Sequence, residues 1–162
     1  MPNMNGPKLY ANTQRITATV TPSTTGYASG DIIGSLITFS NVLGRDAGGG
    51  IIKSAMLVDM AKQVKKATLL LFKEALATGG ITADNSALDL ADTDIPNITG
   101  RIVFGTGSYV SLADNAVAFS TDKDVAFELE DGNDLYGLLL SGGTGTYTSG
   151  EDLTVILEIQ TD

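Results

Sequence analysis

The 162-residue chain contains neither cysteine nor histidine. Without cysteine there can be no disulfide, no thiolate nucleophile and no thiolate metal ligand. Without histidine the chain lacks the usual general base near neutral pH and both the Ser-His and the Cys-His nucleophile pairs. An enzyme of this composition would have to work with carboxylates, lysine or hard metal ions. We therefore predict that the protein is not an enzyme.

Long apolar runs are also missing. The longest apolar stretch, around Leu69 to Phe72, has about four or five residues, far fewer than the roughly 18–20 that cross a bilayer. Residues 1–14 lack the basic region and apolar stretch of a secretory signal. We expect no membrane partner and synthesis in a cytoplasm.

Positive charge is scarce in the second half of the chain. Residues 1–73 hold eight basic and three acidic residues, whereas residues 74–162 hold two basic and sixteen acidic ones, for a net charge of −9. The acidic half would repel phosphate, so we expect no nucleic-acid partner. The asymmetry is explained either by an ordinary solvated surface or by oppositely charged faces that meet between subunits.

The composition, 43% hydrophobic and 18% charged, is typical of a chain that folds as one domain. Short stretches of period-two alternation with turn residues between them predict eight to ten strands. They lie at 15–20, 31–39, 101–104, 109–112, 116–119, 125–129, 134–140 and 153–159. We predict a mainly β fold, an antiparallel β-sandwich with one or two short helices. Residues 1–14 form an extended arm, residues 15–162 the sandwich, 44–50 a loop, and Asp92 caps a helical turn over 95–98.

The segment from Ile51 to Leu76 admits two interpretations. Apolar residues recur every three or four positions from Leu57 to Ala75, which favours an amphipathic helix. Alternatively, 51–60 and 66–73 are two strands of a hairpin with a turn at 61–65. The turn contains no Gly, Asn or Asp, which counts against the hairpin.

Acidic loops are the first candidates for chemistry, because Ca²⁺ and Mg²⁺ prefer several oxygen ligands. One loop holds Asp89, Asp92 and Asp94, and another holds Asp131, Asn133 and Asp134. Neither has the spacing of an EF-hand, and Asp and Asn favour turns and caps by bonding their own backbone. We predict no metal site and no cofactor.

Three other patterns are weaker. Glu128 and Glu130 lie on one face of a strand, but a carboxylate pair alone makes no glycosidase. The glycine stretches 105–107 and 142–145 lack the strand and helix of a dinucleotide site. Five lysines, Lys53, Lys62, Lys65, Lys66 and Lys73, form a basic concentration without the arginines and aromatics typical of nucleic-acid binding. We expect a solvated or subunit-facing surface there.

The order of these features resembles a family of small phage virion proteins, the capsid decoration or cement proteins. The residues that carry the resemblance are Tyr27 to Gly34, the Gly-rich loop leading to 51–59, the run 69–72, then 82–87, 92–94, 134–139 and 147–153. The resemblance covers about residues 27–157. It implies a jelly-roll-like β-sandwich and favours the hairpin interpretation of 51–76.

The resemblance also implies a function. A protein of this family binds the outer capsid surface, stabilises contacts between capsomers, has the major capsid protein as its partner and is located in the virion. A homo-oligomer, with a trimer favoured, follows from the same resemblance. The alternatives are a head-completion or tail protein, or a receptor- or carbohydrate-binding module that would use the tyrosines Tyr10, Tyr27, Tyr109, Tyr136 and Tyr147.

Overall fold

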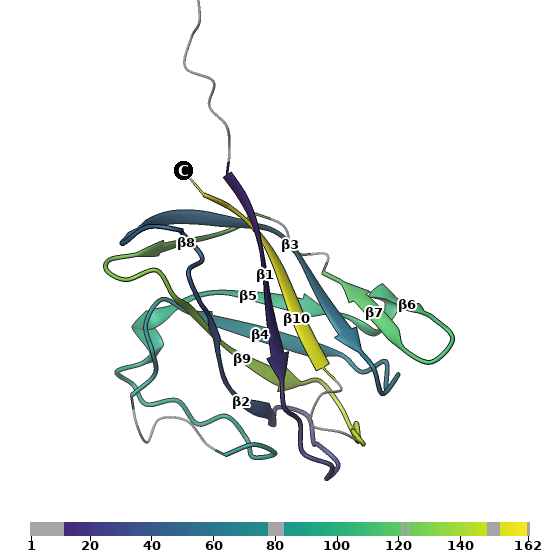
Figure 1. The fold of residues 1–162 in the computed structure, drawn as a ribbon. Coiled ribbons are helices and arrows are strands. Elements are labelled where there is room, and N and C mark those ends of the chain that lie inside the picture. Colours follow the sequence, from purple (N-terminus) through teal and green to yellow (C-terminus); the bar gives the residue numbers. More distant parts are fainter. Residues whose placement is uncertain (1–11, 78–82, 121, 123, 149–152, 162) are drawn as a thin grey trace, which may run out of the picture.

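Two antiparallel β-sheets pack face to face in the computed structural model, which describes residues 12–77, 83–120, 122, 124–148 and 153–161 (Figure 1). The larger sheet has the order β1-β10-β3-β7-β6, and β8 pairs with the first half of β3 beside β7. Its strands are β1 (Asn12–Val20), β3 (Gly48–Asp59), β6 (Tyr109–Ser111), β7 (Ala116–Phe119), β8 (Val125–Leu129) and β10 (Leu153–Thr161). The predicted antiparallel β-sandwich is confirmed.

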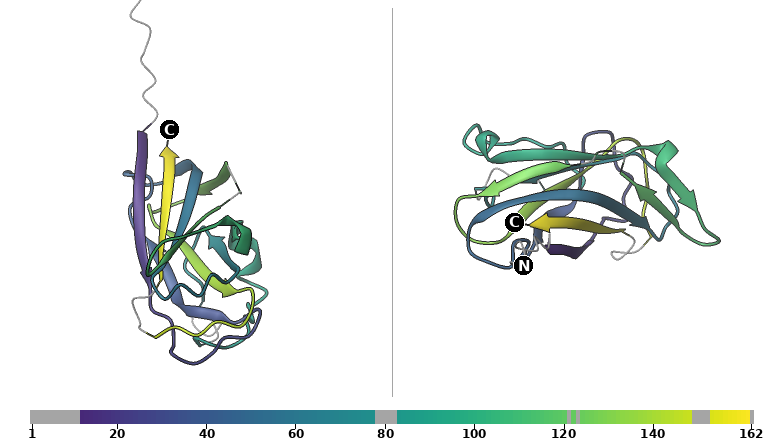
Figure 2. Two further views of the ribbon diagram at one scale, coloured as in Figure 1. Left: turned by 90° about the vertical axis from the view of Figure 1, so that its right-hand side faces the viewer. Right: turned by 90° about the horizontal axis from the view of Figure 1, so that it is seen from above.

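The smaller sheet has the order β2-β9-β4-β5. Its strands are β2 (Ile32–Phe39), β4 (Ala67–Phe72), β5 (Ile98–Phe104) and β9 (Leu135–Ser141). The only helical elements of the described residues are two short 3₁₀ helices, η1 (Ile95–Asn97) and η2 (Thr106–Ser108). Figure 2 shows the two layers from two further directions.

Alternating side chains fill the space between the sheets. Leu153, Val155, Leu157 and Ile159 of β10 are fully buried, as their period-two spacing predicts. They pack in the same cluster as Leu69 and Leu71 of β4 from the opposite sheet, among others. Each fully buried aliphatic side chain of this size stabilises the fold by roughly 1.5–3 kcal/mol.

The outer face of the smaller sheet is covered by the connection between β4 and β5. Leu76, Leu88 and Leu90 of this connection pack with Phe72 and Leu138 in a second apolar cluster. Backbone hydrogen bonds tie it to the sheet edge, since Ile32 N–H donates to Ser86 O and Asn85 N–H donates to Ile32 O, each at 2.9 Å. Because the connection covers the outer face at Leu70 and Phe72, the second half of β4, Leu69 to Phe72, is a continuous apolar run.

The hairpin expected over 51–76 is wrong, although both of its strands exist and no helix forms there. β3 belongs to the larger sheet and β4 to the smaller one, so the chain crosses between the layers. The crossing turn holds Lys62 and Val64 at positive φ, 52° and 51°. The carboxylate of Asp59 accepts a hydrogen bond from Val64 N–H at 2.8 Å and so stabilises this turn.

Several predicted boundaries also need correction. β1 begins at Asn12, three residues inside the predicted arm, because residues 12–14 pair with residues 159–161 of β10. The rest of that arm, 1–11, lies outside the described residues. Gly48–Gly50, expected in a loop, are part of β3 and pair with β8. Asp94 and not Asp92 stands at the N-cap of η1, and β5 already starts at Ile98.

Candidate interaction surface

Figure 1 views the molecule from the side of β1, β10 and β3, onto the outer face of the larger sheet. Antiparallel register aligns outward side chains of neighbouring strands in rows across this face. The first row consists of Val110, Val117, Val58, Thr154 and Thr19, from β6 to β1. The second row consists of Phe119, Met56, Ile156 and Thr17, from β7 to β1. We call these nine positions the uncharged face.

The uncharged face is accessible at both of its lateral ends. Val110 is 52% exposed and Phe119 is 49% exposed, and Thr17 and Thr19 at the opposite end are exposed too. The central side chains, Met56 and Val58 among them, are half-buried by their neighbours within the sheet. All nine residues are apolar or threonine in a chain with 29 charged residues among 162. Six of the nine are apolar and three are threonine, and Val110 and Phe119 are the exposed apolar side chains of the face.

The β6–β7 hairpin, which carries Val110, Val117 and Phe119, is fastened to the crossing turn. Lys62 Nζ donates to the carbonyls of Leu112 and Ala113, at 2.6 and 3.1 Å. Tyr109 Oη donates to Lys65 O at 2.7 Å. Burial, then the charge of Asp59, raises the pKa of Tyr109. These bonds fix the position of the β6–β7 hairpin, which is short and lies at the edge of the sheet.

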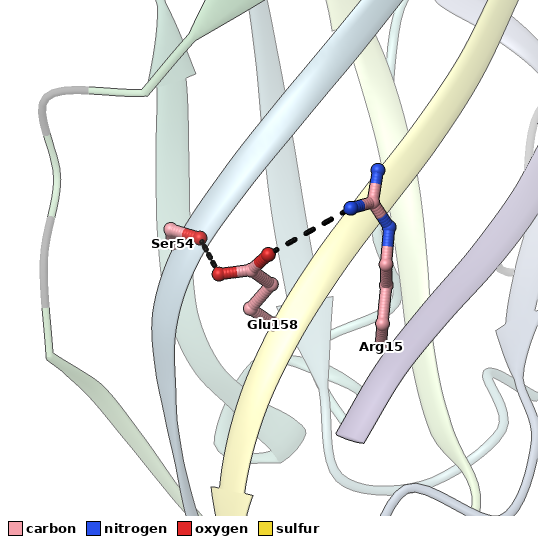
Figure 3. A network of polar contacts seen from close by, with 3 residues as sticks. All are labelled: Arg15, Ser54 and Glu158. Atoms are coloured by element: carbon pink, nitrogen blue, oxygen red, sulfur yellow. Dashed lines mark hydrogen bonds and ion pairs between the residues drawn. The ribbon is translucent and has the colours of Figure 1, made fainter. Parts of the chain in front are cut away.

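A polar row borders the uncharged face. The carboxylate of Glu158 on β10 accepts a hydrogen bond from Ser54 Oγ at 2.8 Å and lies 3.9 Å from Arg15 Nη1 (Figure 3). The side chains of Arg15 and Glu158 are 57% and 43% exposed. A pair this exposed contributes roughly 0–1 kcal/mol to stability. It marks the limit of the uncharged face more than it stabilises the sheet.

The predicted acidic loops do not gather into one site. Asp94 is buried at the start of η1, where its Oδ1 accepts from Ala77 N–H at 3.2 Å, whereas Asp89 and Asp92 are exposed. Asp134 Oδ1 accepts from Asn41 N–H, and Asn133 Nδ2 donates to Asn41 Oδ1. These groups therefore serve turns, as Asp and Asn commonly do. Within the described residues no group of three or more acidic side chains is placed to hold a metal ion.

A small cleft of about 210 Å³ lies beside the second acidic loop, lined by Lys73, Glu74, Ala75, Tyr136 and residues 131–134. Lys73 Nζ donates to Glu130 at 2.5 Å. This contact lowers the pKa of Glu130 and raises that of Lys73. Glu128 is exposed and alternates with buried Phe127 and Leu129 on β8, whereas Glu130 follows the end of that strand and pairs with Lys73, so the two carboxylates do not share one strand face as predicted.

The lysines and the glycine stretches are dispersed. Lys62, Lys65 and Lys66 lie in the crossing turn, Lys53 pairs with Asp124 on the larger sheet, and Lys73 lies at the end of β4. They do not form one patch. Gly105 is the N-cap of η2, and residues 106–107 belong to that helix. Gly142 N–H donates to Lys66 O in the loop after β9.

The tyrosines that a carbohydrate-binding module would need are turned inward. Tyr27 and Tyr147 are buried, with ring centroids 5.9 Å apart in an edge-to-face arrangement. Tyr27 Oη donates to Asp84 Oδ1 at 2.7 Å, and burial, followed by this bond, raises the pKa of Tyr27. Tyr109 and Tyr136 are half-buried, and Tyr10 lies outside the described residues. No described tyrosine is exposed for stacking against a sugar ring.

Comparison with known proteins gives no family for this chain: no family model and no curated protein matches it. None of the helices in the described residues is long and apolar enough to span a membrane.

The sequence of the strands did contain a signal for the uncharged face. Runs such as Ala55 to Val58 are apolar at outward as well as inward positions, which a half-solvated strand does not require.

Proposed function

We propose that the protein is a structural component of a phage virion, a decoration protein that binds the outer capsid surface and stabilises contacts between capsomers. The observation that carries the proposal is the uncharged face, an accessible area free of charge on an otherwise acidic protein. A surface of this kind favours permanent contact with protein and offers nothing to a phosphate backbone. The resemblance of residues 27–157 to capsid decoration proteins is the reason for proposing the capsid as the binding partner.

The proposal includes a jelly-roll type of sandwich. Its support is the order in which the chain visits the two layers. Successive strands alternate between the sheets from β1 to β4 and again from β8 to β10, giving β1-β10-β3-β8 opposite β2-β9-β4-β5. Two interlocked sheets of four strands each, with β6 and β7 added beside β8, are what an eight-stranded jelly roll with one inserted hairpin would give.

A structural role is proposed in place of a catalytic one. The chain has no histidine or cysteine. Most of the carboxylates described above accept hydrogen bonds from backbone amides or form ion pairs, and they lie on different elements of the fold. The proposed partners are the major capsid protein and further copies of the chain. The proposed location is the capsid surface, after synthesis in the host cytoplasm.

Capsid binding tests this proposal directly. Capsids assembled from the proposed partner, the major capsid protein, are incubated with the purified protein and sedimented, and their thermal rupture is followed. We expect co-sedimentation at a saturable ratio and a higher rupture temperature. Protein that stays in the supernatant and leaves the rupture temperature unchanged would refute the capsid role.

A further inference from the structure

We infer that residues 1–11, which directly precede β1 and which we call the N-terminal segment, bind in a groove on the outer face of the larger sheet of the same chain, beside β8. The polar row of Arg15, Ser54 and Glu158 separates this groove from the uncharged face. The inference therefore goes beyond the proposed function and does not depend on the capsid. The form of the groove, its distance from β1 and its charge each support this occupant.

The groove has a volume of about 560 Å³ and lies where β8 pairs with the first residues of β3. Gly49 of β3 has no side chain and Ala126 of β8 has only a methyl group, so the outer face is hollowed between Ile51 and Glu128. Ile51 is 36% exposed there. An extended segment that carries one or two apolar side chains would fit the groove and remove the apolar surface of Ile51 from water.

The start of β1 lies close enough for the N-terminal segment to reach the groove. One row across the larger sheet, from β1 to β8, consists of Asn12, Thr161, Gly50 and Phe127. Neighbouring strands are about 4.8 Å apart, so Asn12 lies about 10 Å from β3 and about 14 Å from β8. An extended chain advances about 3.3 Å per residue, so Leu9 can extend about 10 Å from Asn12 and Lys8 about 13 Å. The segment is therefore long enough to place Leu9 over β3 and Lys8 beside β8.

The charges of the segment and the groove are complementary. Residues 1–11 contain one basic residue, Lys8, and no acidic residue. Among the described residues that line the groove, Glu128 is the one with a charge, and its side chain is exposed. The reach of the segment brings Lys8 to Glu128 while Leu9 and Tyr10 cover Ile51. An ion pair at this position would fix the register of the segment in the groove.

Covalent attachment favours the segment of the same chain over any other occupant. A short flexible connection gives the attached segment an effective concentration on the order of millimolar at the groove. A peptide of another protein, or the segment of a second copy, would need a comparable concentration to compete. The occupant is therefore the segment that begins beside the groove.

Introduced cysteines test the position of the segment, because the natural chain has none. The first protein carries Leu9→Cys and Ala126→Cys, with the second cysteine in the groove. The matched control carries Leu9→Cys and Thr17→Cys, with the second cysteine exposed on the same face of β1. Positions 126 and 17 lie at similar distances from Asn12, about 15 and 17 Å by strand spacing and residue rise. A segment that stays undocked would therefore reach both positions equally well.

Both full-length proteins are oxidised with glutathione at low protein concentration, and the disulfides are identified by mass spectrometry. A disulfide needs the two Cα atoms within about 7 Å of each other. We expect the bond between positions 9 and 126 to form at least about tenfold faster than that between positions 9 and 17, and within single chains. Circular dichroism of the reduced proteins shows whether they are folded.

Glu128→Lys tests the charge of the groove without changing the segment. Chymotrypsin cleavage after Tyr10 measures how often the segment leaves the groove. We expect cleavage of Glu128→Lys to be about two- to fivefold faster than that of the natural protein, as for the loss of an exposed ion pair. Asp114→Lys is the matched control, because it changes the net charge equally and Asp114 is exposed in the turn between β6 and β7. It should leave the rate of cleavage unchanged.

Three results would overturn the inference. They are equal rates of disulfide formation in the two cysteine proteins, disulfides that form mainly between two copies, and cleavage after Tyr10 that Glu128→Lys does not accelerate. A protein that forms the bond between positions 9 and 126 as expected but does not bind capsids supports this inference and contradicts the proposed function alone.

Discussion

The carboxylate of Asp59 accepts a hydrogen bond from the backbone N–H of Val64 at 2.8 Å, within the turn by which the chain crosses from one sheet to the other. Asp59 is 1% exposed, and its Oδ1 has no hydrogen-bond partner among the residues that the structure describes. A buried carboxylate with one unpaired oxygen opposes folding when it is ionised. The same residue therefore stabilises a turn locally and lowers the stability of the ionised protein.

The pH dependence of stability should reveal this effect. Burial raises the pKa of Asp59 above its ordinary value of 3.8, against the opposing effect of the hydrogen bonds from backbone amides. The folded state therefore holds the proton more tightly than the unfolded state, and stability is lost as pH rises from about 4 through the raised pKa. In the variant Asp59→Asn this loss is absent, while the amide oxygen can still accept from Val64.

Urea unfolding of both proteins from pH 3 to pH 8 isolates the contribution of Asp59. We expect the free energy of unfolding of the natural protein, relative to that of the variant, to fall as pH rises above about 4. A relative free energy that rises over the same range would mean that the ionised carboxylate is favoured by folding.

Gly34, the one glycine of β2, should not tolerate substitution. Its φ is +78°, and an added Cβ would lie 2.9 Å from Val20 Cγ1 and 3.0 Å from Thr21 O. We expect Gly34→Ala to lower the free energy of unfolding by roughly 1–3 kcal/mol, through backbone strain and overpacking. Denaturant unfolding measures the change.

Gly105→Ala is the control for this substitution. Gly105 has φ −75° and ψ 155°, an extended conformation open to any residue, and no atom of the described part of the chain lies within 4 Å of an added Cβ. Its effect should stay within about 0.5 kcal/mol. Equal destabilisation by both variants would show that the positive φ and the close contacts of Gly34 do not require glycine.

Lys62 should control the local order of the β6–β7 hairpin. Its ammonium group donates to the carbonyls of Leu112 and Ala113 at the hairpin tip. Lys62→Ala should accelerate amide hydrogen exchange across Tyr109–Phe119 while changing global stability little, because an edge hairpin opens locally. Lys66→Ala, an exposed lysine of the same turn, should leave the exchange of the hairpin unchanged. Equal hydrogen exchange of the hairpin in Lys62→Ala and Lys66→Ala would show that Lys62 does not anchor it.

Strands were the predictable part of this fold. β10 alternates strictly between buried and half-buried residues, so period two alone identifies it. β3 and β4 were harder, because Ala, Met, Lys and Leu favour helix and their apolar residues also fit a helical period. Burial on both faces of β4, under the β4–β5 connection, produces that pattern.

The crossing from β3 to β4 could not be distinguished from a hairpin by local sequence. Its left-handed residues are Lys62 and Val64, where glycine or asparagine would have signalled a turn. Val64 is held by the side chain of Asp59, and Lys62 by the carbonyls of Leu112 and Ala113, which are distant in the sequence. The uncharged face depends likewise on register. Only the pairing of Phe119 with Met56, and of Met56 with Ile156, brings three distant segments into one row.

The central claim, that this protein is a structural component of a capsid surface, is tested most directly by cryo-electron microscopy of capsids with and without the protein. The account predicts additional density on the outer capsid surface, into which the β-sandwich fits with contacts to neighbouring capsomers. Density located in the tail, or capsids that look identical with and without the protein, would contradict it.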